Sequence, residues 1–179
     1  MSSMVSSPTW DELQAMEPDG RRYESLGGVL TVTPSPNGAH QDAVARLLRV
    51  LADAAPPDMK VLPAPYDWVV DPTEWYQPDV VVLRLANFDP RGPLRTAPVL
   101  AVEVISPSTR LYDLNVKRAR YAENGCPSYW VIDPDEPSVL ALELDGEKYQ
   151  EAGQATGEDL FEADRPFTVT FAPAALIDE

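Results

Sequence analysis

Short apolar runs, separated by prolines, glycines and charged residues, alternate along the chain with stretches of helical periodicity. The clearest helix is predicted over residues 38–54, where four side chains share one stripe: His40, Val44, Leu47 and Leu51. Two near-continuous apolar runs, residues 79–85 and 99–105, are typical of strands buried on both faces. The pattern therefore predicts a sheet with helices packed against it.

The N-terminal part is predicted to form a short helix followed by a hairpin. Thr9 and Glu12 have the spacing of a capping box, which would start a helix that ends near residues 18–20. Residues 22–26 and 29–33 flank Gly27-Gly28, and this arrangement is typical of a two-residue hairpin turn. Further short strands are expected at residues 60–62 and 66–70.

The second half adds one helix and several strands. A helix is expected to begin between Ser108 and Asp113 and to end at Gly125, a residue suited to the position after a helix. A strand is expected at residues 128–132. Residues 139–144 and 148–151 are expected to form a hairpin that turns at Asp145-Gly146, and residues 167–171 to form an edge strand. We predict one domain of the α/β (α+β) class over residues 9–179, preceded by a disordered lead-in at residues 1–8.

Composition places the chain among soluble globular proteins, with 44% apolar and 24% charged residues. No segment has the roughly 20 apolar residues that cross a bilayer, and the first residues lack the basic and apolar regions of a signal peptide. Cys126 is the only cysteine, which excludes an intrachain disulfide and a cysteine metal cluster. We expect a cytoplasmic protein with no membrane partner.

The net charge of −15 argues against a general affinity for DNA, because phosphate contacts need cations. Residues 84–120 depart from this balance: seven of the 14 basic residues lie there with only three acids, giving +4 against −19 elsewhere. A local basic surface is therefore predicted, with Arg110, Arg118 and Arg120 as candidate contacts to phosphates. The alternative is that these arginines only solvate a helix face.

Two acidic residues, Asp79 and Glu103, lie at or within strongly apolar predicted strands. An ionised carboxylate in such surroundings is neutralised or recruits a cation. If the two strands are neighbours, both carboxylates point into one cleft and could bind a divalent metal ion through oxygen. The alternatives are a turn role for Asp79 and a buried structural ion pair for Glu103.

Three further candidates lie on neighbouring predicted elements. Lys117 lies on the helical stripe that should face inward, although an i,i+4 pair with Asp113 is the simpler interpretation. His40, the only histidine, lies on the apolar stripe of the long helix, where a core or capping role is common. Glu24 lies in the N-terminal hairpin, where an exposed strand acid is the simpler interpretation. The sequence contains neither a glycine-rich phosphate loop nor a dinucleotide-binding fingerprint.

From about residue 9 to about residue 150, an ordered set of segments resembles the Uma2 family of putative restriction endonucleases, within the PD-(D/E)xK nuclease superfamily. The segments that carry the resemblance are Arg21-Arg22-Tyr23-Glu24, Pro34-Ser35-Pro36 with His40, Gln77-Pro78-Asp79, residues 97–108 around Glu103, Asp113 with Lys117, and Tyr129-Trp130-Val131-Ile132-Asp133.

The resemblance implies a restriction-endonuclease-like fold, which is a mixed central sheet flanked by helices. It implies that Asp79 and Glu103 bind the metal ion, with Glu24 as a further candidate ligand and with His40 and Asp113 as supporting residues. The superfamily motif places a lysine two residues after the second acid, where this chain has Ile105. The resemblance offers Lys117 in its place, and Lys60 is a rival on another predicted strand.

The leading hypothesis is a Mg²⁺-dependent endonuclease that hydrolyses DNA phosphodiester bonds, with Mn²⁺ as an alternative ion. In this hypothesis Lys117 orients the attacking water or offsets the charge that develops on the phosphate. Cleavage of both strands would need two sites, which favours a homodimer. The second hypothesis is a non-catalytic nucleic-acid or protein interaction module on the same fold. A third is hydrolysis of RNA or of a small phosphoester.

Overall fold

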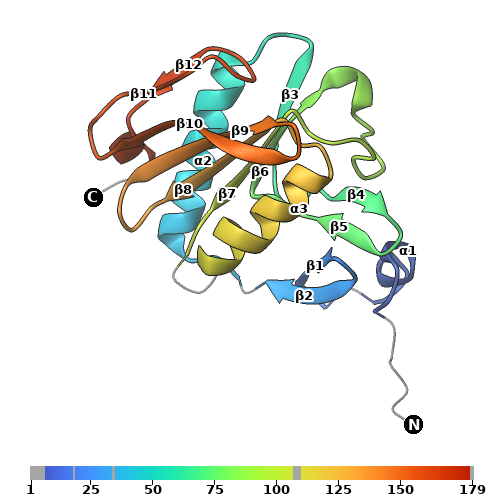
Figure 1. The fold of residues 1–179 in the computed structure, drawn as a ribbon. Helices are drawn as coiled ribbons and strands as arrows, with labels where there is room; N and C mark the ends of the chain where they lie inside the picture. Colours follow the sequence, from blue (N-terminus) through green and yellow to red (C-terminus); the bar gives the residue numbers. More distant parts are fainter. Residues whose placement is uncertain (1–6, 18, 34, 107–109, 178–179) are drawn as a thin grey trace.

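A six-stranded mixed sheet forms the centre of the fold in the computed structural model, which describes residues 7–17, 19–33, 35–106 and 110–177 (Figure 1). Its strand order is β10-β9-β8-β7-β6-β3. β7 and β8 are parallel, and the other neighbouring pairs are antiparallel. The strands are β3 (Met59–Pro63), β6 (Val80–Arg84), β7 (Leu100–Val104), β8 (Ser128–Asp133), β9 (Ser138–Asp145) and β10 (Lys148–Thr156). The predicted fold class is therefore confirmed.

The central strands bury side chains on both faces, as the apolar runs predict. Helix α2 (Gly38–Ala54) covers one face, and helix α3 (Arg118–Glu123) lies on the other (Figure 1). Val80, Val82 and Val102 pack towards α2, whereas Val81 and Ala101 pack with the side that carries α3. This alternation places odd-numbered residues of β6 and β7 on the α3 side of the sheet.

Helix α2 follows the predicted range, Gly38–Ala54. The Asn37 side chain caps its start by accepting a hydrogen bond from the His40 backbone N–H at 2.9 Å. His40, Val44, Leu47 and Leu51 are buried, so the predicted stripe is the face that packs on the sheet.

A second sheet of four strands, ordered β2-β1-β5-β4, joins the N-terminal hairpin to the body of the protein. Its strands are β1 (Arg22–Leu26), β2 (Val29–Thr33), β4 (Trp68–Asp71) and β5 (Glu74–Tyr76). Gly27 and Gly28 form the predicted two-residue turn with φ values of 59° and 77°, which glycine adopts without strain. Strand β5 is not predicted from the sequence, because three residues are too few to show strand periodicity.

Helix α1 (Trp10–Gln14) has the predicted capping box between Thr9 and Glu12, although it is shorter than expected. A disordered lead-in is predicted for residues 1–8, and residues 1–6 of it lie outside the described part of the chain. Among the described residues no helix is long and apolar enough to cross a membrane.

The helix predicted to end at Gly125 departs from a regular α-helix. A π-helical segment (Tyr112–Lys117) precedes α3, and Gly125 follows the helix with φ 74°. The Tyr129 hydroxyl donates a hydrogen bond to the Asp113 backbone carbonyl at 3.0 Å. A side chain that bonds a helix carbonyl in this way favours a local departure from the i→i−4 ladder. The predicted start at Ser108 lies outside the described residues.

The C-terminal part closes the α2 side of the sheet (Figure 1). The β9–β10 hairpin turns at residues 146–147, one position later than predicted, and β10 extends to Thr156. The last predicted strand is β12 (Val169–Phe171), which pairs with β11 (Phe161–Ala163). Two 3₁₀ helices, Leu85–Asn87 and Pro173–Leu176, complete the secondary structure.

Candidate active site

The antiparallel register of β6 and β7 brings the two predicted carboxylates together. Val80 pairs with Val102 and Val81 with Ala101, so one further step places Asp79 opposite Glu103. Opposite residues of an antiparallel pair point to the same face. Both acids therefore lie on the α3 side of the sheet. The two strands are neighbours, which was the condition for the two carboxylates to share a face.

Asp79 is held by three donors and is 5% exposed. Arg22 Nη1 lies 3.1 Å from Oδ1, His40 Nε2 lies 3.2 Å from Oδ2, and the Val104 backbone N–H donates to Oδ2 at 2.9 Å. Burial would raise the pKa of Asp79, but the hydrogen bond from His40 and the nearby positive charges lower it to about 2. Asp79 is therefore an ionised carboxylate with a fixed orientation.

Glu103 is 2% exposed and has one partner on each oxygen. The Tyr121 hydroxyl donates to Oε1 at 2.6 Å, and Lys117 Nζ lies 3.1 Å from Oε2. Burial raises the pKa of Glu103 well above its usual range, and the opposing charge of Lys117 does not compensate for it.

Lys117 is the cation at the centre of the acidic cluster. Its Nζ lies 3.0 Å from Glu24 Oε2, 3.1 Å from Glu103 Oε2 and 3.8 Å from Asp113 Oδ1. Burial would lower the pKa of Lys117, but the charges of Glu103 and Glu24 raise it instead. The i,i+4 pair with Asp113 is thus present, but the lysine stem does not reach to solvent, because its side chain is only 4% exposed.

The two other positions considered for a lysine do not reach this cluster. Ile105 is 3% exposed and belongs to the apolar core on the α3 side. Lys60 Nζ lies 4.6 Å from the centroid of the Phe88 ring, in a cation–π contact. Lys117 is therefore the lysine in contact with Glu103.

Glu24 departs from its simpler interpretation, whereas His40 is a buried, hydrogen-bonded residue, as its simpler interpretation expects. Glu24 is 1% exposed and accepts a hydrogen bond from the Gln77 backbone N–H at 2.8 Å, so it is not an exposed strand acid. The ring of His40 contacts Asp79 from the start of α2. Both side chains join the cluster that the resemblance predicts.

Sequence reasoning missed the roles of Arg22 and Tyr121, which hold Asp79 and Glu103. Arg22 shares a strand face with Glu24, two positions later, and Tyr121 follows Lys117 by four positions. The i,i+2 spacing on a strand and the i,i+4 spacing on a helix are the sequence features that could have indicated these contacts. The Arg22 side chain is 21% exposed, the highest value among the partners of Asp79, and its buried Nε has no hydrogen-bond partner among the described residues.

The charge of the cluster suits a divalent cation. Four acidic groups, Asp79, Glu103, Glu24 and Asp113, face two permanent cations, Lys117 and Arg22. With His40 neutral, the excess is two negative charges when Glu103 is ionised and one when its raised pKa keeps it protonated. In the described ranges no three His, Cys, Asp or Glu side chains converge as a metal cage. Mg²⁺ binds through one or two carboxylates together with water and phosphate oxygens. Asp79 and Glu103 supply this type of ligand, and in this structure each of their oxygens has a protein partner.

The three arginines predicted to contact nucleic acid have other partners. Arg110 pairs with Asp133. Arg118 Nη2 donates to the Tyr149 carbonyl at 3.3 Å, and Arg120 Nη1 lies 2.8 Å from Glu123 Oε2. These contacts do not join them to the cluster around Lys117.

Comparisons with known proteins show the family and the fold of the chain. A family model described as "Putative restriction endonuclease", Uma2, matches residues 10–175. The crystal structure of a putative nuclease belonging to DUF820 from Anabaena variabilis is similar, with a TM-score of 0.75 and 19% sequence identity, covering 95% of this chain and 97% of that chain. At this identity the likeness shows the fold alone. No curated protein sequence matches the chain.

Proposed function

Because the chain belongs to the Uma2 family of putative restriction endonucleases, we propose that it is a Mg²⁺-dependent endonuclease that hydrolyses DNA phosphodiester bonds. The observation that carries the proposal is the contact of Lys117 with Glu103, 3.1 Å from Nζ to Oε2, beside Asp79 on the neighbouring strand. An acid pair with an adjacent lysine is the residue set that the family resemblance implies. Here the lysine comes from a helix rather than from the strand.

In this proposal Asp79 and Glu103 hold the metal ion, with Glu24 as a further ligand. A bound Mg²⁺, or Mn²⁺, supplies Lewis-acid polarisation of the scissile phosphate and of the attacking water. The protein residues fix the geometry: His40 and the Val104 N–H orient Asp79, and Tyr121 orients Glu103.

The two cations serve different parts of the phosphate. The Lys117 ammonium, held by Glu24, Glu103 and Asp113, orients the attacking water and offsets charge that develops on the phosphate. Arg22 keeps Asp79 in place with Nη1, and the exposed part of its side chain is available to a phosphate oxygen. Arg22 is suited to meet the substrate because it is partly exposed.

Contacts to more distant phosphates are proposed for Arg110, Arg118 and Arg120, which lie in the segment of net charge +4. Double-strand cleavage would need two active sites, so we also propose a homodimer. Sedimentation of the protein with and without DNA tests this assembly.

A second candidate function, a non-catalytic interaction module, has one observation in its favour. Asp79 and Glu103 are 5% and 2% exposed, and every oxygen of the pair has a protein partner. A purely structural ion cluster would look the same. The two functions therefore have to be separated by experiment.

The test combines metal binding with cleavage. Calorimetric titration of Mg²⁺ and Mn²⁺ should show saturable binding that Glu103→Gln abolishes, and the wild type should nick supercoiled plasmid DNA in the same ions. Lys117→Met should lower the nicking rate by at least about 100-fold. The matched controls are Glu162→Gln and Lys148→Met, at exposed positions of β11 and β10. Folding of each variant is checked by thermal unfolding.

Two results would contradict the proposal. Folded Glu103→Gln and Lys117→Met proteins that nick DNA like the wild type would exclude these residues from catalysis. A wild type that neither binds metal, alone or with DNA, nor cleaves a broad set of DNA substrates would favour the interaction module.

A further inference from the structure

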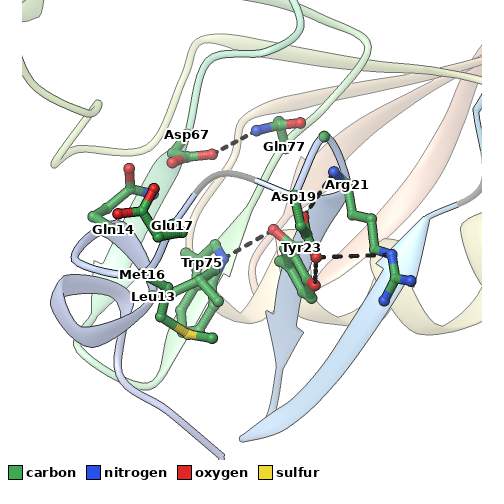
Figure 2. Close-up of a pocket in the computed structure, with 11 residues that line it drawn as sticks. Leu13, Gln14, Met16, Glu17, Asp19, Arg21, Tyr23, Asp67, Trp75 and Gln77 are labelled. Atoms are coloured by element: carbon green, nitrogen blue, oxygen red, sulfur yellow. Dashed lines mark hydrogen bonds and ion pairs between the residues drawn. The ribbon is translucent and has the colours of Figure 1, made fainter.

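A cavity of about 270 Å³ lies between helix α1 with its following turn and the strands β1 and β5 (Figure 2). Leu13 and Met16 line it on the helix side, and Tyr23, Trp75 and Gln77 line it on the sheet side. Its volume is slightly below the range of pockets that hold drug-sized ligands, so it suits a small flat molecule.

Gln77, a residue of this lining, carries a buried hydrogen-bond acceptor that has no partner among the described residues. Its Nε2 donates to Asp67 Oδ1 at 2.8 Å, which fixes the orientation of the amide (Figure 2). Asp67 is held in turn by Trp10, whose Nε1 donates to Oδ2 at 2.8 Å. Gln77 is 8% exposed, and within the described part of the chain its Oε1 has no hydrogen-bond partner. A buried acceptor without a partner is costly, so this oxygen is suited to a donor from a ligand.

The same residue connects the cavity to the acidic cluster. The Gln77 backbone N–H donates to Glu24, the Gln77 backbone carbonyl accepts from Arg22, and Asp79 follows two positions later. A ligand at the Gln77 side chain therefore lies next to a residue whose backbone contacts Glu24 and Arg22, two groups of the proposed active site.

The polar lining selects the chemistry of the ligand. Gln77 Oε1 and the carboxylates of Asp67, Glu17 and Asp19 are acceptors. The carboxylates outnumber the one cation among the lining residues, Arg21, which pairs with Asp19 at 3.7 Å, so the lining disfavours a phosphate group. The rings of Tyr23 and Trp75 provide apolar walls (Figure 2). Enzymes that carry out chemistry on a nucleobase read the extruded base by hydrogen bonds to its edge and by contacts with aromatic side chains. Cytosine, adenine and guanine carry an exocyclic amino group, whereas thymine does not.

We propose that this cavity receives a substrate nucleobase that carries an exocyclic amino group, donated to Gln77 Oε1, beside the scissile phosphate. The proposal rests on the proposed function, because it takes the substrate to be a nucleic acid. It adds a base preference to a site whose metal and lysine chemistry acts on any phosphodiester.

The test uses free nucleosides, so that neither a metal ion nor cleavage is needed. Cytidine, adenosine, guanosine and N3-methylthymidine, whose base has no N–H donor, are titrated into the metal-free wild type, and the Trp75 indole and Gln77 side-chain amide are followed by NMR. The three amino-bearing nucleosides should give saturable shifts, with N3-methylthymidine at least about tenfold weaker, as expected for one lost hydrogen bond.

Two variants test the location of binding. Gln77→Met removes the acceptor at similar volume and should weaken binding by about tenfold or more. Met16→Trp places an indole at a 60% exposed position of the cavity lining and should block binding without altering the buried network. Leu160→Trp, at a 67% exposed position outside the lining, is the matched control and should bind like the wild type.

Three outcomes would overturn the cavity proposal: equal binding of all four nucleosides, no saturable shift of Trp75 and Gln77, or unchanged binding by Met16→Trp. Shifts that Ca²⁺ reproduces would also overturn it, because the acidic lining would then be a cation site. None of these outcomes changes the result expected for plasmid cleavage, so the proposed function would still stand. Conversely, nucleoside binding in a protein that cleaves no DNA would contradict the proposed endonuclease and leave the base site standing.

Discussion

The ammonium of Lys117 lies 3.1 Å from the carboxylate of Glu103, although the two residues come from a helix and a strand rather than from one strand. Ile105 occupies the strand position where the superfamily motif has its lysine, and it is buried in the apolar core. The helix instead brings the Lys117 ammonium to the carboxylate of Glu103. Lys117 is the last residue of the π-helical segment. The chemistry depends on this proximity rather than on sequence spacing.

Replacing Lys117 by Met should destabilise the protein by about 3–5 kcal/mol, because Glu24, Glu103 and Asp113 would lose a buried counter-ion. Urea unfolding near neutral pH measures the change. Lys148→Met, at an exposed position of β10, should stay within about 0.5 kcal/mol of the wild type. A loss below about 1 kcal/mol for Lys117→Met would contradict an ionised cluster.

Tyr121→Phe should weaken Mg²⁺ or Mn²⁺ binding by about 10–100-fold, because it removes the hydroxyl that orients Glu103. The ring itself should stay in place, since edge-on contacts with Tyr76 and Tyr129 hold it at 5.0 Å and 5.2 Å between centroids. Calorimetry of metal binding gives the affinities. Tyr66→Phe is the control, as its hydroxyl makes only a long 3.5 Å hydrogen bond. Equal affinities for Tyr121→Phe and the wild type would refute the positioning role.

The two turn glycines should respond differently to substitution by alanine. Both have positive φ, so each replacement should cost about 1–2 kcal/mol. A Cβ at Gly27 would lie 2.1 Å from Arg120 Nη2, whereas a Cβ at Gly28 meets nothing within 4 Å. Gly27→Ala should therefore be the more damaging variant in thermal unfolding. The difference should disappear in an Arg120→Ala background, and its persistence there would exclude the clash as its cause.

Cys126 should resist alkylation in the folded protein. Burial raises the pKa of the Cys126 thiol from 9.0 to about 12, which lowers the thiolate fraction at pH 8 by about a thousandfold. The reaction rate should keep rising with pH beyond 9 in the native protein, but level off near that value after unfolding in urea. Rapid labelling at pH 8 without denaturant would show that the thiol is exposed or ionised.

Arg110→Ala should reduce DNA affinity and lower the slope of log K against log salt by about 0.9, the value for one lost phosphate contact. Arg110 is the best placed of the three candidate arginines, since half of its side chain is exposed despite the pair with Asp133. Anisotropy titrations of a labelled duplex at several salt concentrations give the slope. Arg165→Ala, at a 75% exposed position paired with Glu143, should leave it unchanged. A slope that does not change in Arg110→Ala would remove this residue from the DNA surface.

The sequence by itself determined the longer strands of the central sheet, the long helix and the two acids in apolar runs, Asp79 and Glu103. Residues 79–85 and 99–105 are apolar enough to specify buried strands, and the stripe of Leu47 and Leu51 specifies a helix packed on one face. A carboxylate inside such a strand, as at Glu103, is conspicuous because burial penalises its charge. Local periodicity and the cost of buried charge are properties that a linear sequence carries.

Only the tertiary structure decided which of these groups meet. The register of β6 and β7 sets Asp79 opposite Glu103, and the return of the helix brings Lys117 to both Glu24 and Glu103. The sequence also did not predict the short strand β5 or the hydrogen-bond partners of Gln77, because both depend on residues distant in the chain. Charges interact over a few ångströms of space, and periodicity along a sequence does not encode that distance.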